Sequence, residues 1–214
     1  EPPSLDILQL LLSELQYTMQ DNPDLGADER KYVFSYSGFI KRWSLQRLQQ
    51  TLDPQWDKLY WDTMLFEARN RVVDSYLIYL EKNRDPEDKF YEPRRKQFLK
   101  MGFTQALQDL IDDEIDILSI STVPGSGKTT LGEMFMSGFM GWFPDLCNLF
   151  SSHSGHVTRM VYQVVCNIIG IGLKPGQIPE YTWREIFPDV EVESNNANEQ
   201  EINLGKFKPF KTLT

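Results

Sequence analysis

The sequence has few residues of the kinds that build disulfide scaffolds and metal centres. It holds two cysteines, Cys147 and Cys166, and two histidines among 214 residues. A disulfide framework needs more cysteines than this, so we expect both thiols to be free and buried, in a reducing, intracellular setting. No cysteine or carboxylate near His153 and His156 completes a ligand set, which disfavours a metal site there.

Long apolar runs and an excess of basic residues are missing too. No run approaches the roughly 18–20 residues that cross a bilayer, so we expect no membrane-spanning helix and no membrane partner. Lysine and arginine number 22 against 31 aspartate and glutamate residues, which gives a net charge of −9. This balance excludes a free-standing nucleic-acid coat, because phosphate binding needs clustered basic side chains. Hydrophobic residues make up 41% of the chain, which indicates a globular protein with a packed core.

The first part of the chain, residues 1–84, is predicted to be a helical N-terminal region. Apolar residues at three- and four-residue spacing predict a helix over 5–19, and the proline and glycine within 22–26 end it. An Asp-Pro pair is typical of a helix start, so a longer helix is expected over 53–83. A third helix is expected over 93–113.

The second part, residues 85–214, changes character. Short β-branched runs predict strands over 115–121 and 147–151. Each precedes a predicted helix, the first over 128–142 and the second capped by Ser154 and extending to Ile169. The order strand, loop, helix, strand, helix predicts a parallel sheet with right-handed crossovers. The expected fold class is therefore α/β, with an incomplete P-loop NTPase parallel-sheet core that follows the helical region.

The C-terminal part is predicted to hold a short helix and several short strands. Thr182 and Glu185 have the spacing of a capping box at the start of that helix. Strands are expected over 190–193, 202–204 and 207–213, as a hairpin or meander around a polar turn.

Three lysines, Lys206, Lys208 and Lys211, follow one another along this tail, and Lys206 and Lys208 would share one face of a strand. They could contact DNA phosphates. An exposed strand edge also favours lysine, because its charge resists aggregation. Both interpretations stay open.

The most informative stretch is the loop from Thr122 to Thr130. It matches the end of the Walker A (P-loop) pattern, except that Thr122 stands where the pattern has its first glycine. Gly125 and Gly127 let the backbone approach an anion, and N–H groups at a helix N-terminus favour negative charge. Lys128 can reach the β- and γ-phosphates of ATP as the catalytic lysine.

This loop predicts ATP and Mg²⁺ as cofactors. Thr129 can offer its hydroxyl to Mg²⁺, a hard ion that prefers oxygen ligands. The residues expected to bind the nucleotide here are Pro124, Gly125, Ser126, Gly127, Lys128, Thr129 and Thr130. The alternative is a Gly-Ser-Gly turn with a surface lysine; the predicted strand before the loop and the apolar helix after it favour the nucleotide site.

A complete P-loop ATPase also needs an acidic residue at the end of an apolar strand, to hold Mg²⁺ and orient water. No such strand follows the loop. The acidic residues in 185–189 belong to a predicted helix end, and those in 112–114 precede the loop. We expect the acid to lie beyond Thr214, so that these residues alone bind nucleotide without hydrolysing it.

Four further segments occur in a distinctive order around the glycine loop. They are Phe-Tyr-Glu-Pro-Arg-Arg-Lys-Gln at 90–97, Leu-Phe-Ser-Ser-His-Ser at 149–154, Tyr-Thr-Trp-Arg-Glu-Ile-Phe-Pro-Asp at 181–189 and Lys-Phe-Lys-Pro-Phe at 206–210. This succession resembles the ATPase domain of the large terminase subunit of tailed bacteriophages. The resemblance covers roughly residues 85–214.

The resemblance implies an ATPase that powers packaging of double-stranded DNA into an empty capsid, in the host-cell cytoplasm during virion assembly. It implies self-association into a ring motor, with the portal protein and a small terminase subunit as partners. The segment before the loop would recognise adenine: Tyr91 would stack on the base, and Arg94 and Gln97 would hydrogen-bond to it. A solvated helix face is the alternative for this segment. Many large terminases carry an arginine near the position of Pro124. If that arginine binds phosphate or couples hydrolysis to movement, another residue must take this role here.

Two other functions remain open. A helicase-like or other P-loop ATPase unrelated to packaging would carry the same loop. A non-catalytic interaction module would bind partners through its helical half and keep a vestigial P-loop. An apolar strand ending in Asp-Glu after Thr214 would favour the packaging ATPase, and its absence would favour the module.

Overall fold

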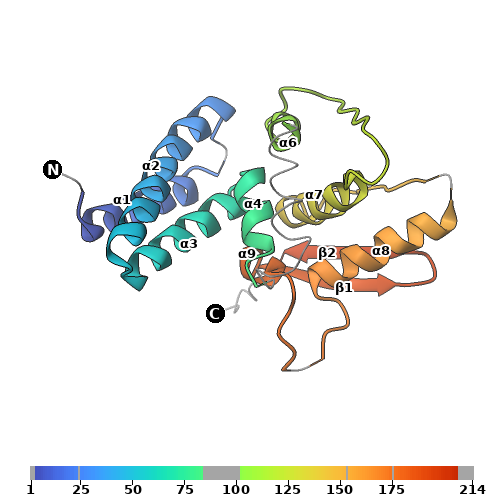
Figure 1. The fold of residues 1–214 in the computed structure, drawn as a ribbon. Helices are drawn as coiled ribbons and strands as arrows, with labels where there is room; N and C mark the ends of the chain where they lie inside the picture. The colour runs from blue at the N-terminus through green and yellow to red at the C-terminus, as the bar shows by residue number, and fades with distance from the viewer. Residues whose placement is uncertain (1–2, 24, 84–101, 153, 175, 207–214) are drawn as a thin grey trace, which may run out of the picture.

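The computed structural model describes residues 3–23, 25–83, 102–152, 154–174 and 176–206. This part of the chain is mostly helical (Figure 1). Its helices are α1 (Leu5–Asp21), α2 (Ala27–Thr51), α3 (Pro54–Arg69), α4 (Val73–Leu80), α6 (Phe103–Ile111), α7 (Lys128–Trp142), α8 (Gly155–Ile169) and α9 (Trp183–Ile186). Its strands are β1 (Val190–Asn196) and β2 (Glu201–Lys206).

The predicted parallel-sheet core, and with it the α/β fold class, is wrong. The sheet in the described residues has two strands, β1 and β2, which pair antiparallel as a hairpin. The predicted strands over 115–121 and 147–151 have no regular secondary structure. Each segment has an apolar side chain that faces solvent: Ile117 is 85% exposed and Leu149 is 90% exposed. A strand forms only by pairing with a partner, and neither segment has a hydrogen-bonded neighbour strand in the described chain.

Several helices lie where the periodicity predicts them. Helix α7 spans the predicted residues, and α8 begins directly after Ser154, the predicted cap, although the Ser154 side chain makes no capping hydrogen bond. The hairpin β1–β2 contains the two predicted strands at 190–193 and 202–204. The third predicted strand, over 207–213, lies outside the described residues.

The long helix predicted over 53–83 is two helices. Asp53 caps α3 through a 2.9 Å bond from the Gln55 N–H, but α3 ends at Arg69. Arg71 adopts a left-handed conformation, φ 72°, and the chain turns into α4. Asn70 supports the break, because its side chain donates to the Phe66 carbonyl oxygen at 2.7 Å.

Two further expectations are corrected. Of the helix predicted over 93–113, the described part is α6, and residues up to 101 lie outside the described chain. At α9 there is no capping box: the Thr182 hydroxyl instead donates to the Tyr79 carbonyl oxygen, at 2.6 Å. Thr182 thus ties α9 to the end of α4.

Helix α2 has no counterpart among the predicted helices. Its buried face consists of Val33, Ser37, Ile40 and Ser44. Two of these four residues are serines, so the apolar stripe that marks a buried helix face is weak here. The Ser44 hydroxyl donates to the Ile40 carbonyl oxygen within the helix, and the Ser37 hydroxyl donates to the Glu67 carboxylate, so both are satisfied in the core.

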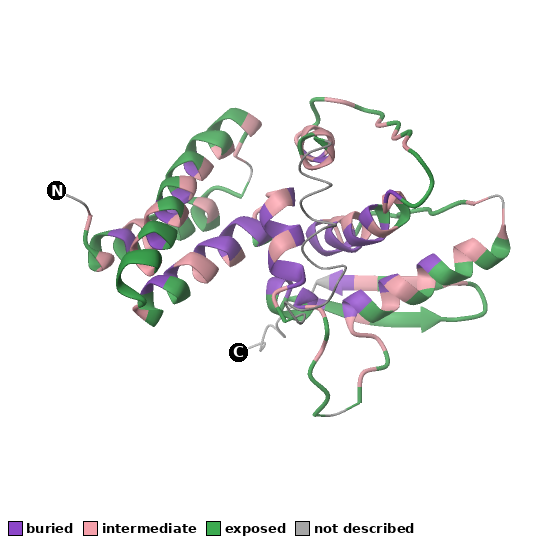
Figure 2. Cartoon of the chain, in the orientation of Figure 1, coloured by how far each residue is buried: buried purple, intermediate pink, exposed green. Residues whose placement is uncertain are grey.

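The core consists of two apolar clusters that share α3. The smaller cluster joins α1, α2 and α3 through residues such as Leu8, Ile40 and Leu59. The larger cluster extends from α3 through α4, α6, α7, α8 and α9 to β1. Figure 2 shows the buried residues gathered at the centre of the molecule, in α3, α4 and α7. The division predicted at residue 84 stays a prediction.

Buried hydrogen bonds fix α7 against its neighbours. The Tyr76 and Ser137 hydroxyls lie 2.7 Å apart, and the Trp142 indole donates to the Ala68 carbonyl oxygen at 2.8 Å. The Trp183 indole donates to the Ser137 carbonyl oxygen, also at 2.8 Å. These bonds satisfy polar groups that would be costly to bury alone. They hold α7, and hence the loop that precedes it, on the frame made by α3, α4 and α9.

A buried carboxylate joins α2, α3 and α4. Glu67 is 2% exposed and accepts hydrogen bonds from Ser37, Lys41 and Ser75. The Lys41 ammonium supplies the compensating charge. A carboxylate this deep needs such partners, because desolvation disfavours its charged form.

None of the described helices has the length and apolar character that crossing a bilayer requires.

Candidate functional site

The glycine loop leads directly into α7. Gly125 and Gly127 have positive φ angles, 82° and 85°, and Gly127 is the residue that caps the helix. Other side chains rarely adopt this conformation, so the loop requires glycine at both places. The first intrahelical bond runs from the Leu131 N–H to the Gly127 carbonyl oxygen, at 2.9 Å. The N–H groups that come before Leu131 in the first turn have no acceptor within the helix, as at every helix start. Together with the helix dipole they favour an anion at this place.

Lys128 folds back over the loop. Its ammonium donates to the Thr122 carbonyl oxygen at 2.8 Å and lies 3.4 Å from the Val123 carbonyl oxygen. The side chain therefore lies on the loop, half-buried. This arrangement places a positive charge beside the N-terminus of α7, where both the ammonium and the helix dipole attract phosphate.

Thr122 and Ser126 close the loop. Their hydroxyls hydrogen-bond to each other, and the Ser126 N–H donates to the Val123 carbonyl oxygen at 3.3 Å. Ser126 is only 5% exposed. The threonine that departs from the Walker A pattern thus has a structural role, which the sequence does not reveal because it depends on how the loop folds.

The other predicted nucleotide-binding residues of the loop differ in exposure. Pro124 and Thr129 are exposed, and Thr130 is half-buried. The exposed Thr129 hydroxyl lies on the first turn of α7, in reach of solvent and of a hydrated metal ion. The described residues hold no group of three or more histidine, cysteine or acidic residues that could bind a metal ion.

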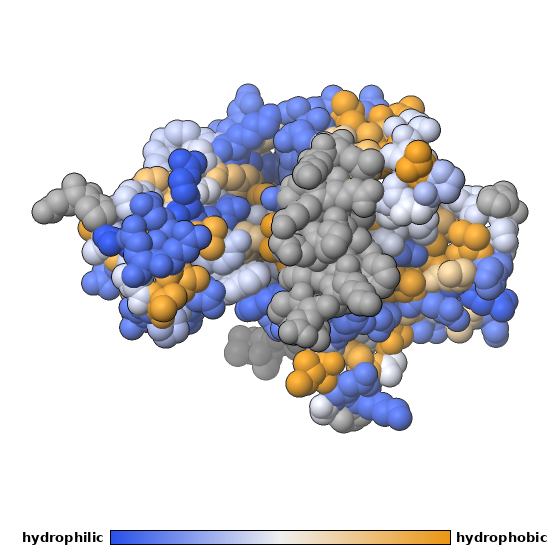
Figure 3. Space-filling view, viewed as in Figure 1, coloured by the Kyte–Doolittle hydropathy of each residue, from blue (hydrophilic) through white to orange (hydrophobic). Residues whose placement is uncertain are grey.

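A P-loop connects a strand to a helix, and only the helix is present around this loop. A helix follows it, but the preceding segment 115–123 is irregular rather than a strand. Figure 3 shows apolar side chains at the surface at the upper right, where Figure 1 places this segment. Ile117 and Val123 are both strongly exposed. The predicted adenine-binding residues Tyr91, Arg94 and Gln97 lie outside the described residues, so the structure does not relate them to the loop.

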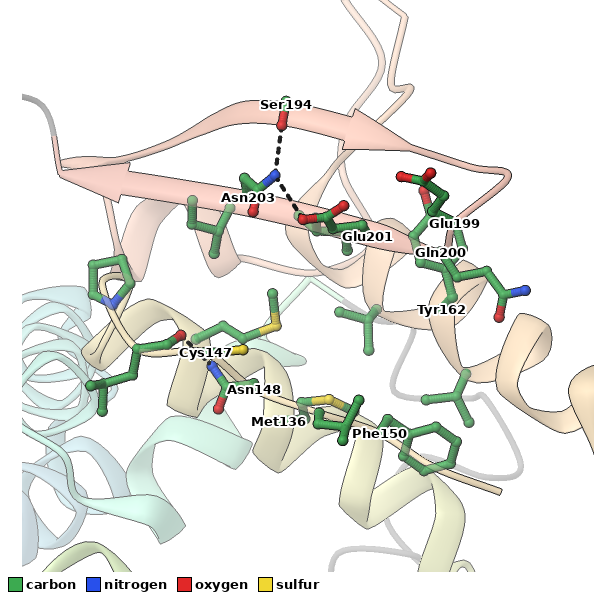
Figure 4. A pocket seen from close by; sticks show the side chains of 18 of the residues that line it. Met136, Cys147, Asn148, Phe150, Tyr162, Ser194, Glu199, Gln200, Glu201 and Asn203 are labelled. Carbon is green, nitrogen blue, oxygen red and sulfur yellow. Dashed lines mark hydrogen bonds between the residues drawn. The ribbon is translucent and has the colours of Figure 1, made fainter. Parts of the chain in front are cut away.

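A groove that the sequence analysis did not predict lies between α7, α8 and the hairpin (Figure 4). Its volume is about 790 Å³, and no residue of the loop 122–130 lines it. Cys147, expected in a buried strand, is exposed on its wall, and Cys166 is half-buried on α8. Burial raises the pKa of the Cys166 thiol. The groove forms where residues of the hairpin meet α7, α8 and the segment 144–150 between these helices, so no local pattern signals it.

Comparison with known proteins gives no match. No protein-family model matches the chain, and neither a curated protein nor a solved structure is significantly similar to it. The resemblance to large terminases therefore stays a prediction that rests on the sequence segments alone.

Proposed function

We propose that the loop 122–130 binds the phosphates of ATP together with Mg²⁺. The observation that supports this most is the position of Lys128, whose ammonium lies on the loop beside the N-terminus of α7. Two glycines with positive φ bracket Ser126 at the same place. A lysine, a glycine-rich turn and a helix N-terminus are the three features that attract a phosphate chain.

Each residue has a role in this proposal. Lys128 exchanges the carbonyl oxygens of Thr122 and Val123 for the β- and γ-phosphates, and it stabilises the charge that develops during hydrolysis. Pro124 has no N–H to donate, so the backbone N–H groups from Gly125 to Thr130 cradle the phosphates. Thr129 provides an oxygen ligand to Mg²⁺, a hard ion that keeps much of its water shell.

The wider role that we propose is the ATP-binding part of a motor that packages double-stranded DNA, like the large terminase subunit. The sequence segments quoted above support it. The partners would be the portal protein, a small terminase subunit and further copies of the chain in a ring, in the host-cell cytoplasm. In this role Tyr91 would stack on adenine, and Arg94 and Gln97 would bind its edge.

Calorimetry with MgATP and MgADP tests the site. Lys128→Ala should weaken binding by about ten- to a hundredfold, because a charge-assisted hydrogen bond contributes about 1.5–3 kcal/mol. Lys174→Ala is the matched control: this lysine is exposed, outside the loop, and its loss should leave the affinity unchanged. Equal affinities of the wild type and Lys128→Ala would contradict the proposal. We expect no phosphate release by residues 1–214, since neither of the strands that the structure describes after the loop ends in an acidic residue.

One observation favours a second candidate, a non-catalytic interaction module. The groups that phosphate would use are already engaged: Lys128 binds loop carbonyls, and the Ser126 N–H binds Val123. A vestigial loop would stay in this closed state. Failure of the wild-type chain to bind MgATP at millimolar concentration would support the module. Duplex unwinding by the protein would instead favour another helicase-like ATPase.

A further inference from the structure

The groove between α7, α8 and the hairpin has an acidic rim. Four carboxylates line it, from Asp145, Glu193, Glu199 and Glu201, and all four residues are exposed. Its described lining includes no lysine, arginine or histidine. No described cation pairs with any of the four. The rim therefore attracts a positively charged occupant.

The floor of the groove is apolar. Met136 and Met140 come from α7, and Val161 and Val165 come from α8. Methionine side chains are flexible and adapt to different apolar partners. An occupant that fits this groove thus carries apolar side chains as well as positive charge.

The hairpin contributes an unpaired strand edge. Residues 200–204 all line the groove in succession, although successive side chains of a strand point to opposite faces. Glu193 and Ser194 of β1 line it too, so the groove follows the hairpin and includes the edge of β2 that faces away from β1. β2 pairs with β1 alone in the described chain, so the backbone groups of its other edge are available. Figure 4 shows β2, which carries Glu201 and Asn203, on one side of the groove and Cys147 and Asn148 on the opposite wall.

A buried acceptor lies at the end of this edge. The side-chain oxygen Oε1 of Gln200 is buried and accepts no hydrogen bond from the described residues. Gln200 lines the groove at the start of β2, where its backbone has a φ of 56°. A buried oxygen without a donor is costly, so a ligand N–H placed there would be favoured.

We infer that this groove binds an extended segment of a partner protein in which apolar residues alternate with lysine or arginine. The segment adds a strand to the free edge of β2. Its apolar side chains contact the methionines and valines of the floor, and its basic side chains pair with Glu199 and Glu201. The inference is independent of nucleotide binding at the loop 122–130, because the two sites share no residue.

The probe for the test is a fluorescein-labelled peptide of alternating valine and lysine, about nine residues long, measured by anisotropy with residues 1–214. Two control peptides separate the contributions. In one, glutamate replaces lysine; in the other, alternate backbone amides are N-methylated, which keeps the charge but removes donors to the strand edge. We expect saturable binding of the probe, no binding of the glutamate peptide, and affinity about tenfold or more weaker for the N-methylated peptide.

Variants of the chain locate the site. Glu199→Gln combined with Glu201→Gln should weaken probe binding by about three- to tenfold, since each exposed ion pair contributes modestly. Glu191→Gln, on β1 and outside the groove, removes the same kind of charge and should change nothing. Equal binding of the N-methylated peptide, or an equal loss from Glu191→Gln, would show attraction by net charge alone and would overturn the inference.

Discussion

Gly141→Ala tests the packing of α7 most directly. A Cβ at position 141 would lie 2.4 Å from two atoms of the Phe187 ring and 2.6 Å from a third. That ring cannot easily move away: it is 6% exposed, and its centroid lies 5.1 Å from that of Trp183 and 6.1 Å from that of Trp142. The substitution therefore overpacks the junction of α7 with α9.

The magnitude follows from two opposing effects. Overpacking a core costs about 1–3 kcal/mol, and replacing a helical glycine by alanine recovers up to about 1 kcal/mol. We expect a net loss of about 1–2 kcal/mol in the free energy of unfolding. For a chain of this size the thermal midpoint should fall by roughly 2–8 °C.

Gly132→Ala is the matched control on the same helix. Position 132 is exposed, and a Cβ there would meet no atom within 4 Å, so only the gain in helix propensity remains. The midpoint should rise by about 1–4 °C. Thermal unfolding followed by far-UV circular dichroism measures both variants. If Gly141→Ala raises the midpoint as Gly132→Ala does, Phe187 does not pack against α7 and the reasoning fails.

Two further predictions concern the buried carboxylate and the thiols. Glu67→Gln should lower the free energy of unfolding by about 1–3 kcal/mol in urea titrations, because the substitution removes the counter-charge of Lys41. The loss stays within this range because the Lys41 ammonium can still reach water. An unchanged urea midpoint would contradict this prediction. At pH 8 a thiol reagent should label Cys147 rapidly and Cys166 slowly, since burial raises the pKa of the Cys166 thiol and lowers its thiolate fraction. Cys147→Ser should remove the fast phase, and a fast phase that survives would show that Cys166 is accessible.

The helices that the sequence predicted best are those whose signals are local. The stripe of α8 and the glycine at the start of α7 act within a few residues, because helix hydrogen bonds join residues four apart. Even so, the pattern over 53–83 did not show the break at Asn70–Val72. Helix α2 was not predicted, because two serines interrupt the apolar stripe on its buried face.

The predicted strands failed for the complementary reason. The runs at 115–121 and 147–151 have strand-like composition, yet a strand exists only when a distant segment pairs with it. Such a partner cannot be deduced from the composition of the run itself. The hairpin β1–β2 succeeded because its two strands are neighbours along the chain, joined by a short turn.

By itself, the sequence determined the glycine loop, the residue types that could bind phosphate and most of the helices, since each depends on chemistry within a short stretch. Only the tertiary structure decided that the Thr122 and Ser126 hydroxyls hydrogen-bond and that the Lys128 ammonium binds the Thr122 carbonyl oxygen. The acidic groove along the hairpin is likewise a result of the tertiary structure. These features join residues through the folded backbone, and the groove joins segments more than fifty residues apart. Local propensity carries no information about such contacts, because they depend on how the helices pack.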